Sequence, residues 1–342
     1  MRVTRDTLIR NAKEIAQERA YNDHDIVAAY LTGSLLSEDP MLGGTADIDI
    51  VFVHRNQPAK GREFIKLTPD FHVDISRRTR DQFKSPRELR GDPWMGYEMY
   101  DPILLYEREK FFDFVQASLR AGFDFEGPPL RLQRCRKMLL HARQVWMDLT
   151  ELPEVIGPKE VRRFMKSLFH AVNTIAELSG PPVQERRLLL EFPARAEAAR
   201  NPGLAAGALG LMGAKDLDPE KMKGWLPDWK AAFTSACGIP GVDVRIDPVR
   251  LNYYEKAIKS MLDGETPLSA LWPLLHTWTL STERLGGDHL KFWQNVVTEL
   301  GLSGPGFEER VQGLDQYIDG IEILLDEMAA ANGLETSSGN SK

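Results

Sequence analysis

The stretch Leu31-Thr-Gly-Ser-Leu-Leu-Ser-Glu-Asp-Pro-Met-Leu-Gly-Gly-Thr-Ala-Asp-Ile-Asp-Ile-Val-Phe-Val53 decides what the chain can build, because it places two acids inside an apolar run. Residues 46–53 are otherwise apolar and predict a buried β-strand. Successive side chains of a strand point to opposite faces, so Asp47 and Asp49 are expected on one face and Ile48 on the other. The two carboxylates are therefore expected side by side.

Two carboxylates at this spacing repel each other and are costly near an apolar core unless a positive charge lies between them. A hard divalent cation such as Mg²⁺ takes oxygen ligands and keeps positions open for water and for substrate phosphates. Asp47 and Asp49 therefore predict a metal site that serves a nucleoside triphosphate.

A glycine-serine turn precedes this strand. Gly33 and Ser34 precede Asp47, with twelve residues between Ser34 and Asp47. Glycine lets the backbone approach a ligand closely, and a serine at the start of a helix offers both its hydroxyl and its amide to an anion. The turn is thus a candidate for holding the phosphates.

A third acid lies in a later strand. The segment Phe71-His-Val-Asp-Ile75 alternates apolar and polar side chains, which is the pattern of a half-buried strand. If this strand pairs beside residues 46–53, Asp74 can join the other two carboxylates.

The remaining pattern separates the chain into two parts. Gly127-Pro128-Pro129 is its clearest break, and the chain beyond it has helical spacing. Before the break, residues 54–68 are hydrophilic and are expected to form a connection. The expected strands are 26–31, 46–53, 71–76 and 103–106, and the expected helices are 6–20, 81–89 and 110–120.

Composition limits the classes of protein that fit. The chain has 342 residues, 42% of them hydrophobic, and a net charge of -7, which disfavours a broad nucleic-acid surface. Two isolated cysteines and seven histidines without ligand spacing predict neither disulfides nor a zinc site. No apolar run reaches the length of a membrane span, and no apolar leader follows Arg2 and Arg5, so we expect a cytoplasmic protein.

Gly33-Ser34, twelve residues, and then Asp47-Ile48-Asp49-Ile50 in a strand resemble the signature of the DNA polymerase beta-type nucleotidyltransferase superfamily. That signature is Gly-Ser or Gly-Gly, about ten residues, then Asp-hydrophobic-Asp/Glu-hydrophobic. Asp74 matches the position of the third carboxylate. The resemblance covers roughly the first 125 residues. The two-domain plan is similar to the antibiotic nucleotidyltransferases of the kanamycin, streptomycin and lincosamide types.

The resemblance implies an α+β fold, with an N-terminal mixed sheet and flanking helices followed by an all-α helical bundle. With the break at residue 127, it implies a catalytic domain over residues 1–127 and a helical acceptor-binding domain over 128–331. The Gly/Ser-rich composition of residues 332–342 predicts a disordered tail.

The resemblance also implies an activity: transfer of a nucleoside monophosphate, AMP from ATP, onto a hydroxyl of an acceptor, with pyrophosphate leaving. Asp47, Asp49 and Asp74 would bind two Mg²⁺ ions, and Asp74 could instead accept the hydroxyl proton. Gly33 and Ser34 would hold the triphosphate. Lys166 would add a cation for the phosphates, because related enzymes carry such a lysine on an early helix of the second domain.

Three kinds of acceptor or role stay open. The net negative charge of the chain favours a cationic small molecule as the acceptor. The acceptor could instead be a protein side chain, whereas RNA is disfavoured by the shortage of basic charge. A non-catalytic nucleotide sensor or a toxin–antitoxin component is the alternative outside enzymology. Neither a membrane partner nor nucleic acid is expected, and a homodimer is compatible with the sequence.

Overall fold

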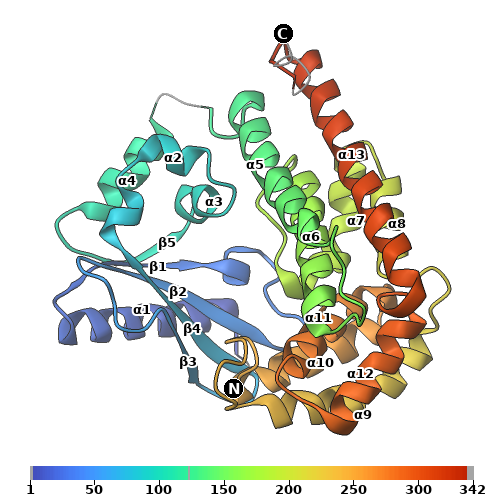
Figure 1. Ribbon diagram of the computed structural model, residues 1–342. Coiled ribbons are helices and arrows are strands. Elements are labelled where there is room, and N and C mark those ends of the chain that lie inside the picture. Colours follow the sequence, from blue (N-terminus) through green and yellow to red (C-terminus); the bar gives the residue numbers. More distant parts are fainter. Residues whose placement is uncertain (1–2, 122–123, 337–342) are drawn as a thin grey trace. The chain divides into compact units, whose positions relative to one another are not determined.

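A five-stranded mixed sheet organises the N-terminal part of the computed structural model, which describes residues 3–121 and 124–336 (Figure 1). The strand order is β3-β4-β2-β1-β5. The strands are β1 (Ile26–Thr32), β2 (Ala46–His54), β3 (Arg62–Lys66), β4 (Phe71–Thr79) and β5 (Ile103–Glu107). β2 runs parallel to β4, and the other neighbouring strands are antiparallel. Two central strands, β2 and β4, thus lie side by side in the same direction.

The two faces of this sheet pack against different helices. Ile48, Ile50 and Phe52 of β2 join an apolar cluster with buried residues of α1 (Arg5–Asn22). On the other face, Val51 and Val53 join a second cluster with residues of α2, α3 and α4. The strict alternation along β2 therefore matches a strand that is buried on both faces.

The short helices on the second face depart from the expected pattern. Two 3₁₀ helices and three α-helices complete this part of the chain: η1 (Gly33–Leu36), η2 (Arg80–Phe83), α2 (Pro86–Arg90), α3 (Met95–Tyr100) and α4 (Phe111–Arg120). The helix expected over 81–89 is split, because Pro86 has no N–H to continue a helix from η2 and starts α2 instead. Helix α3 was not predicted.

Strand β3 was also missed. It lies inside residues 54–68, which were expected to be an irregular connection. β3 pairs with β4 at the edge of the sheet, and its two apolar residues, Phe64 and Ile65, are adjacent and do not alternate with the charged ones. An edge strand needs few apolar residues, so this sequence cannot be told from a hydrophilic loop by its pattern.

The C-terminal part is helical. Helix α5 packs against α6, and α13 packs against both. Helix α11 packs against α6, α9 and α12. The helices are α5 (Pro128–Met147), α6 (Pro158–Ala176), η3 (Glu185–Arg187), α7 (Leu188–Ala198), α8 (Gly203–Leu211), α9 (Pro219–Ala236), η4 (Pro248–Arg250), α10 (Leu251–Leu262), η5 (Pro267–Ala270), α11 (Leu271–Thr282), α12 (Gly287–Glu299), η6 (Gly304–Gly306) and α13 (Phe307–Ala331).

Buried tryptophans hold α9, α11 and α12 together. The indole N–H of Trp229 donates to the Thr277 hydroxyl over 2.9 Å, and that of Trp293 donates to the Thr279 hydroxyl over 3.0 Å. Between α5 and the end of α6, Arg134 pairs with Glu177 over 2.8 Å, and both side chains are fully buried. These buried polar side chains are thus hydrogen-bonded, as burial favours.

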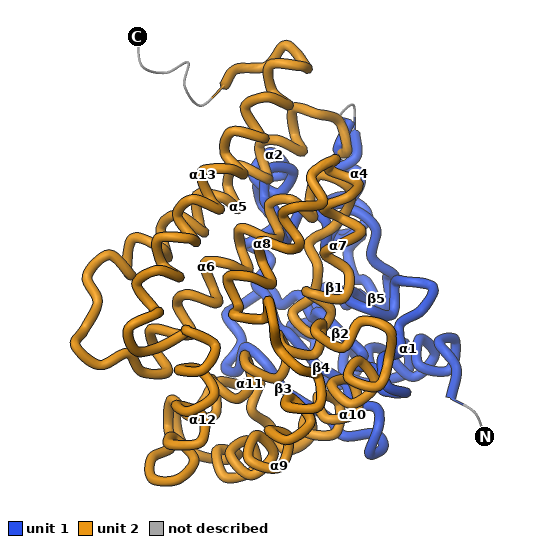
Figure 2. Tube along the Cα trace, turned by 90° about the vertical axis from the view of Figure 1, so that its right-hand side faces the viewer, with its two compact units in different colours: residues 1–125 blue, residues 126–342 orange. Residues whose placement is uncertain are grey.

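The chain divides into two units, which Figure 2 colours separately. We call residues 1–125 unit 1 and residues 126–342 unit 2. The α+β fold class expected from the sequence is confirmed: a mixed sheet with helices is followed by a helical region. The expected tail over 332–342 lies partly outside the described residues, which end at 336. None of the helices in the described part of the chain is long and apolar enough to cross a membrane.

Candidate metal centre

Three carboxylates converge on β2 and β4 in unit 1. In the parallel pairing of these strands, Asp49 lies directly beside Asp74, and Asp47 is two residues earlier on β2. One oxygen from each of the three side chains lies within 4.8 Å of the other two. Asp47 is 6% exposed and Asp74 is 2% exposed. Negative charges this close repel one another, and a bound cation would stabilise the three carboxylates.

The acidic residues of β2 lie on the same face of the strand as two of its buried valines. Asp47, Asp49, Val51 and Val53 alternate onto one face of β2. Val51 and Val53 pack into the cluster formed with α2, α3 and α4, while Asp47 and Asp49 occupy the other end of the strand. One strand face therefore changes from apolar to acidic within a few residues.

The glycine turn brings the backbone of β1 against this acidic end. β1 ends at Thr32, which lies opposite Asp49, and Gly33 follows with φ of +77°. A side chain at position 33 would collide with the carboxylate, because an added Cβ would lie 1.9 Å from Asp49 Oδ2. Glycine is required here both for its left-handed backbone and for the missing side chain.

Ser34 is the second residue of η1, the 3₁₀ helix that starts at Gly33 beside Asp49. Its Oγ is buried and has no hydrogen-bond partner among the described residues. A buried hydroxyl without a partner needs an explanation, and a bound ligand would supply one. Ser34 thus suits the phosphate contact predicted for it, whereas N-cap duty alone would give its hydroxyl a backbone partner.

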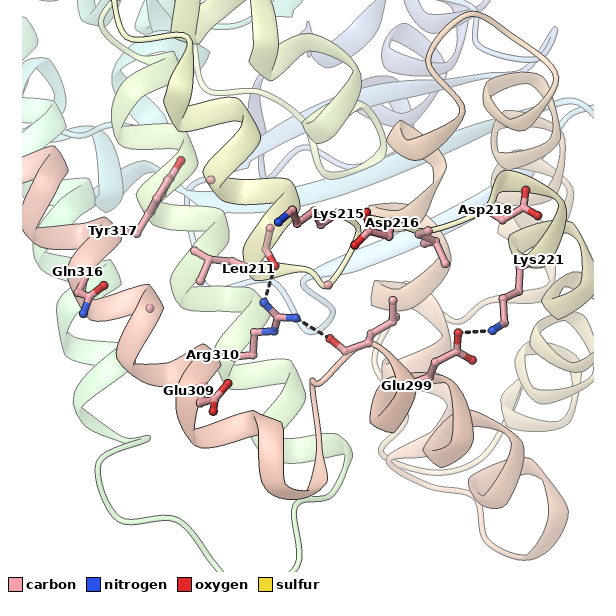
Figure 3. A pocket seen from close by; sticks show the side chains of 16 residues that line it. Leu211, Lys215, Asp216, Asp218, Lys221, Glu299, Glu309, Arg310, Gln316 and Tyr317 are labelled. Carbon is pink, nitrogen blue, oxygen red and sulfur yellow. Dashed lines mark hydrogen bonds and ion pairs between the residues drawn. The ribbon is translucent and has the colours of Figure 1, made fainter.

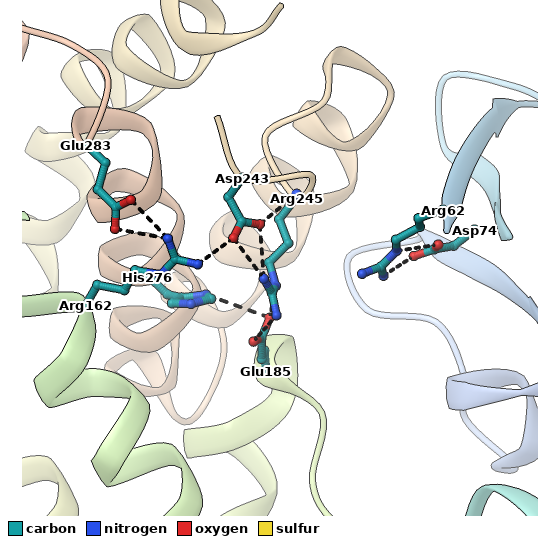
Figure 4. Close-up of polar contacts among 8 residues, drawn as sticks. All are labelled: Arg62, Asp74, Arg162, Glu185, Asp243, Arg245, His276 and Glu283. Carbon is teal, nitrogen blue, oxygen red and sulfur yellow. Dashed lines mark hydrogen bonds and ion pairs between the residues drawn. The ribbon is translucent and has the colours of Figure 1, made fainter. Parts of the chain in front are cut away.

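One residue of the site was missed by sequence reasoning. Arg62 on β3 donates from Nε to Asp74 Oδ1 over 2.8 Å and from Nη2 to Asp74 Oδ2 (Figure 4). The pairing is bidentate, the geometry in which a guanidinium fits a carboxylate best. No signal in the sequence separated Arg62 from the other charged residues of 54–68, because β3 itself was not recognised.

These carboxylates fit a divalent cation by chemistry. The donor set is all oxygen, it is held by two rigid strands, and it offers three negative side chains. Hard cations such as Mg²⁺ and Mn²⁺ prefer such donors. Among the described residues, no other group of His, Cys, Asp or Glu ligands comes together in this way.

The predicted phosphate-binding lysine lies in unit 2. Lys166 is on α6, and its side chain is exposed. It is close enough to His170 to help lower the pKa of that imidazole, after burial and His141. Its role toward a nucleotide stays a prediction.

A polar cluster in unit 2 has a structural explanation (Figure 4). Arg245 donates to both oxygens of Glu185 over 2.8 and 3.0 Å, and Arg162 pairs with Asp243 over 2.7 Å and with Glu283 over 3.0 Å. Burial lowers the pKa of the neighbouring His276, which is therefore neutral at pH 7. These pairs tie the connection after α9 to α6, η3 and the end of α11.

Unit 2 also contains a cavity of about 940 Å³ between α8, α13 and the start of α9 (Figure 3). Arg310 donates to the carbonyls of Gly210 and Leu300 over 2.7 and 3.2 Å, and Lys221 pairs with Glu299. The charged side chains labelled there are thus partly used in holding the helices together. The carboxylates of unit 1 remain the better candidate for chemistry.

Comparisons with known proteins add one structural likeness. No protein-family model matches the chain, and no curated protein matches it. Among solved structures it is similar to a nucleotidyltransferase-like protein from Exiguobacterium sibiricum 255-15, with 10% identity over 95% of this chain and 92% of that chain, and a TM-score of 0.27. Because so low a score does not define a shared arrangement, the functional assignment rests on the carboxylates and the turn beside them.

Proposed function

We propose that the chain is a Mg²⁺-dependent nucleotidyltransferase that moves AMP from ATP onto a hydroxyl of an acceptor and releases pyrophosphate. The observation that supports this is the convergence of Asp47, Asp49 and Asp74 beside the left-handed turn at Gly33. Metal-binding acids next to a phosphate-holding turn are what attack on a phosphate of a nucleotide requires.

The reaction we propose is an in-line displacement. The acceptor hydroxyl oxygen forms a bond to the α-phosphorus, the bond from that phosphorus to the pyrophosphate oxygen breaks, and the hydroxyl proton passes to a base. Bound Mg²⁺ would supply charge stabilisation for the attacking and leaving oxygens. Asp47, Asp49 and Asp74 would hold the metal, and Asp74 is our candidate for the base if its pairing with Arg62 is released.

The turn and a lysine would position the nucleotide. Gly33 lets the backbone approach the triphosphate, and the Ser34 hydroxyl would donate to one of its oxygens. Lys166 would neutralise charge on the phosphates as pyrophosphate leaves. The acidic net charge of -7 favours a cationic small molecule as the acceptor.

The test is pyrophosphate release from ATP with Mg²⁺ across a panel of hydroxyl acceptors. We expect turnover by the natural chain and a loss of at least about a hundredfold in Asp49→Asn, since a carboxylate metal ligand is removed. Asp101→Asn is the matched control: this unit 1 acid is 88% exposed and pairs with Arg120, so activity should be unchanged. Full activity in Asp49→Asn would overturn the proposal.

A labelling experiment separates the alternatives. Tagged ATP added to a cell lysate with the purified chain labels a protein band if the acceptor is a protein side chain. A labelled small molecule indicates an acceptor of the antibiotic type. Tight ATP binding without turnover over the whole panel, together with one co-purifying partner, indicates a non-catalytic regulatory protein.

A further inference from the structure

We propose that Arg62 is a built-in counter-cation of the metal centre: it holds Asp74 when no divalent cation is bound, and the cation must displace it from that carboxylate. This inference rests on the proposed function, because it assumes that the three carboxylates bind a metal. It adds a residue that tunes the affinity for that metal.

The contact between Arg62 and Asp74 is built by the pairing of β3 with β4. Phe64 lies directly opposite Asp74, and Arg62 lies opposite Ser76, two residues further along β4. Side chains at such diagonal positions share a face and are within reach when one of them is long. The guanidinium carbon also lies 5.4 Å from the centre of the Phe64 ring, which supports the side chain from the same strand.

Both oxygens of Asp74 accept from Arg62, and the Nε–Oδ1 distance is 2.8 Å. The same carboxylate supplies the oxygen that lies within 4.8 Å of oxygens from Asp47 and Asp49. A cation that takes this oxygen shares the carboxylate with the guanidinium and draws on its negative charge, and the two positive charges repel each other. Binding of the metal and the bidentate contact therefore oppose each other.

The side chains of Asp74 and Arg62 differ in how easily they can move when a metal ion binds. Asp74 is fixed in the sheet and its side chain is 2% exposed, whereas the side chain of Arg62 is 33% exposed. Exchange therefore needs no change in the strands, because the arginine can rotate toward solvent while the carboxylate keeps its place. Loss of the guanidinium without a metal ion in its place would leave more of the repulsion among the three carboxylates, which destabilises the fold.

The first test measures binding of Mn²⁺ alone to the full-length chain, by the loss of the free-ion signal in electron paramagnetic resonance. We expect Arg62→Gln to bind Mn²⁺ about tenfold more tightly than the natural chain, since a charged hydrogen-bonding competitor is removed. Arg19→Gln is the matched control. Arg19 is 39% exposed and donates to both oxygens of Glu63, so its loss removes a similar pair away from the carboxylates and should leave affinity unchanged.

The second test measures stability against urea without metal. Arg62→Gln should be less stable than the natural chain and should regain stability when Mn²⁺ is added. The double variant Arg62→Gln with Asp74→Asn also removes the carboxylate charge that Arg62 faces, so it should recover stability without Mn²⁺ and respond little to the ion. If Arg62 has a structural role alone, the variant should be less stable but should gain no more stability from Mn²⁺ than the natural chain does.

The outcomes separate this inference from the proposed function. Asp49→Asn should abolish Mn²⁺ binding if the metal centre is correct. If Arg62→Gln then binds Mn²⁺ only as tightly as the natural chain or more weakly, the role proposed for Arg62 is wrong, although the metal centre is supported. If neither the natural chain nor Arg62→Gln binds Mn²⁺ better than Asp49→Asn, the metal centre itself is wrong, and both proposals fall.

Discussion

Position 33 shows how one residue can be constrained twice. Its backbone is left-handed, which costs other residues about 1–2 kcal/mol. Its missing side chain also leaves room for the Asp49 carboxylate. The sequence indicated a close backbone approach to a ligand at Gly33. The structure adds that the same gap admits an acid of the protein itself.

Gly33→Ala and Gly44→Ala separate these two constraints. Gly44 is also left-handed, with φ of +72°, but an added Cβ there meets nothing within 4 Å. We expect each variant to lose about 1–2 kcal/mol of unfolding free energy from backbone strain. Gly33→Ala should lose Mn²⁺ binding as well, because Asp49 is pushed from its place. Urea unfolding and Mn²⁺ titration check both; equal metal affinity in the two variants contradicts the role given to Gly33.

At the scale of elements, apolar runs predicted β1, β2 and β5, alternation predicted β4, and helical spacing predicted the long helices. The sequence also predicted that Asp47 and Asp49 share a face. Which strand lies beside β2 could not be derived, because a local pattern carries no information about pairing between segments distant in sequence. The sequence therefore placed Asp74 beside the other two acids only on the condition that its strand pairs with β2. In the structure these strands do pair, and Asp49 lies beside Asp74.

The residues that sequence reasoning missed share a physical cause. β3 is short and at the edge of the sheet, so five residues with two apolar side chains are sufficient for it. Its Arg62 acquires a function only through tertiary pairing with β4. Helix α7 shows the opposite case: Pro193 lies inside Leu188–Ala198 without ending it, although a proline favours a break.

The α5–α6 pair carries a pH-dependent prediction. Burial, with further contributions from His141 and Lys166, lowers the pKa of His170 to about 4. The unfolded chain has a histidine near its ordinary value and binds more protons between that value and about 4. The folded state therefore loses stability as pH falls through this window, by up to about 3 kcal/mol at pH 4.

His170→Gln removes that titration. We expect urea unfolding of the natural chain to show a drop in stability from pH 7 to pH 4.5, and the drop should be smaller in the variant. Both proteins should unfold reversibly at pH 7 for the comparison to hold. An identical pH dependence in the two proteins would show that His170 is not held neutral by its surroundings.

At the scale of the whole molecule, each unit has its own apolar core. Unit 1 packs the two faces of its sheet against helices, and unit 2 packs its helices around buried tryptophans. The break at Gly127-Pro128-Pro129 lies close to the division between the units. Asp47, Asp49, Asp74 and Arg62 all belong to unit 1.

Residues 1–125 expressed alone should therefore fold and bind Mn²⁺ as the full chain does, while residues 126–342 should fold without binding it. Circular dichroism and Mn²⁺ titration of the two fragments test this. Binding that is lost from a folded fragment 1–125 would show that unit 2 supplies a ligand.

The position of β3 has a further consequence for the behaviour of the chain in solution. Within the described residues of unit 1, β3 pairs with β4 on one side, and its other side ends the sheet. The unpaired backbone groups of an open strand edge can form hydrogen bonds with a strand of a second molecule. Charged side chains such as Arg62, Glu63 and Lys66 oppose that pairing. The charged residues that made β3 hard to predict from the sequence therefore also protect its open edge against aggregation.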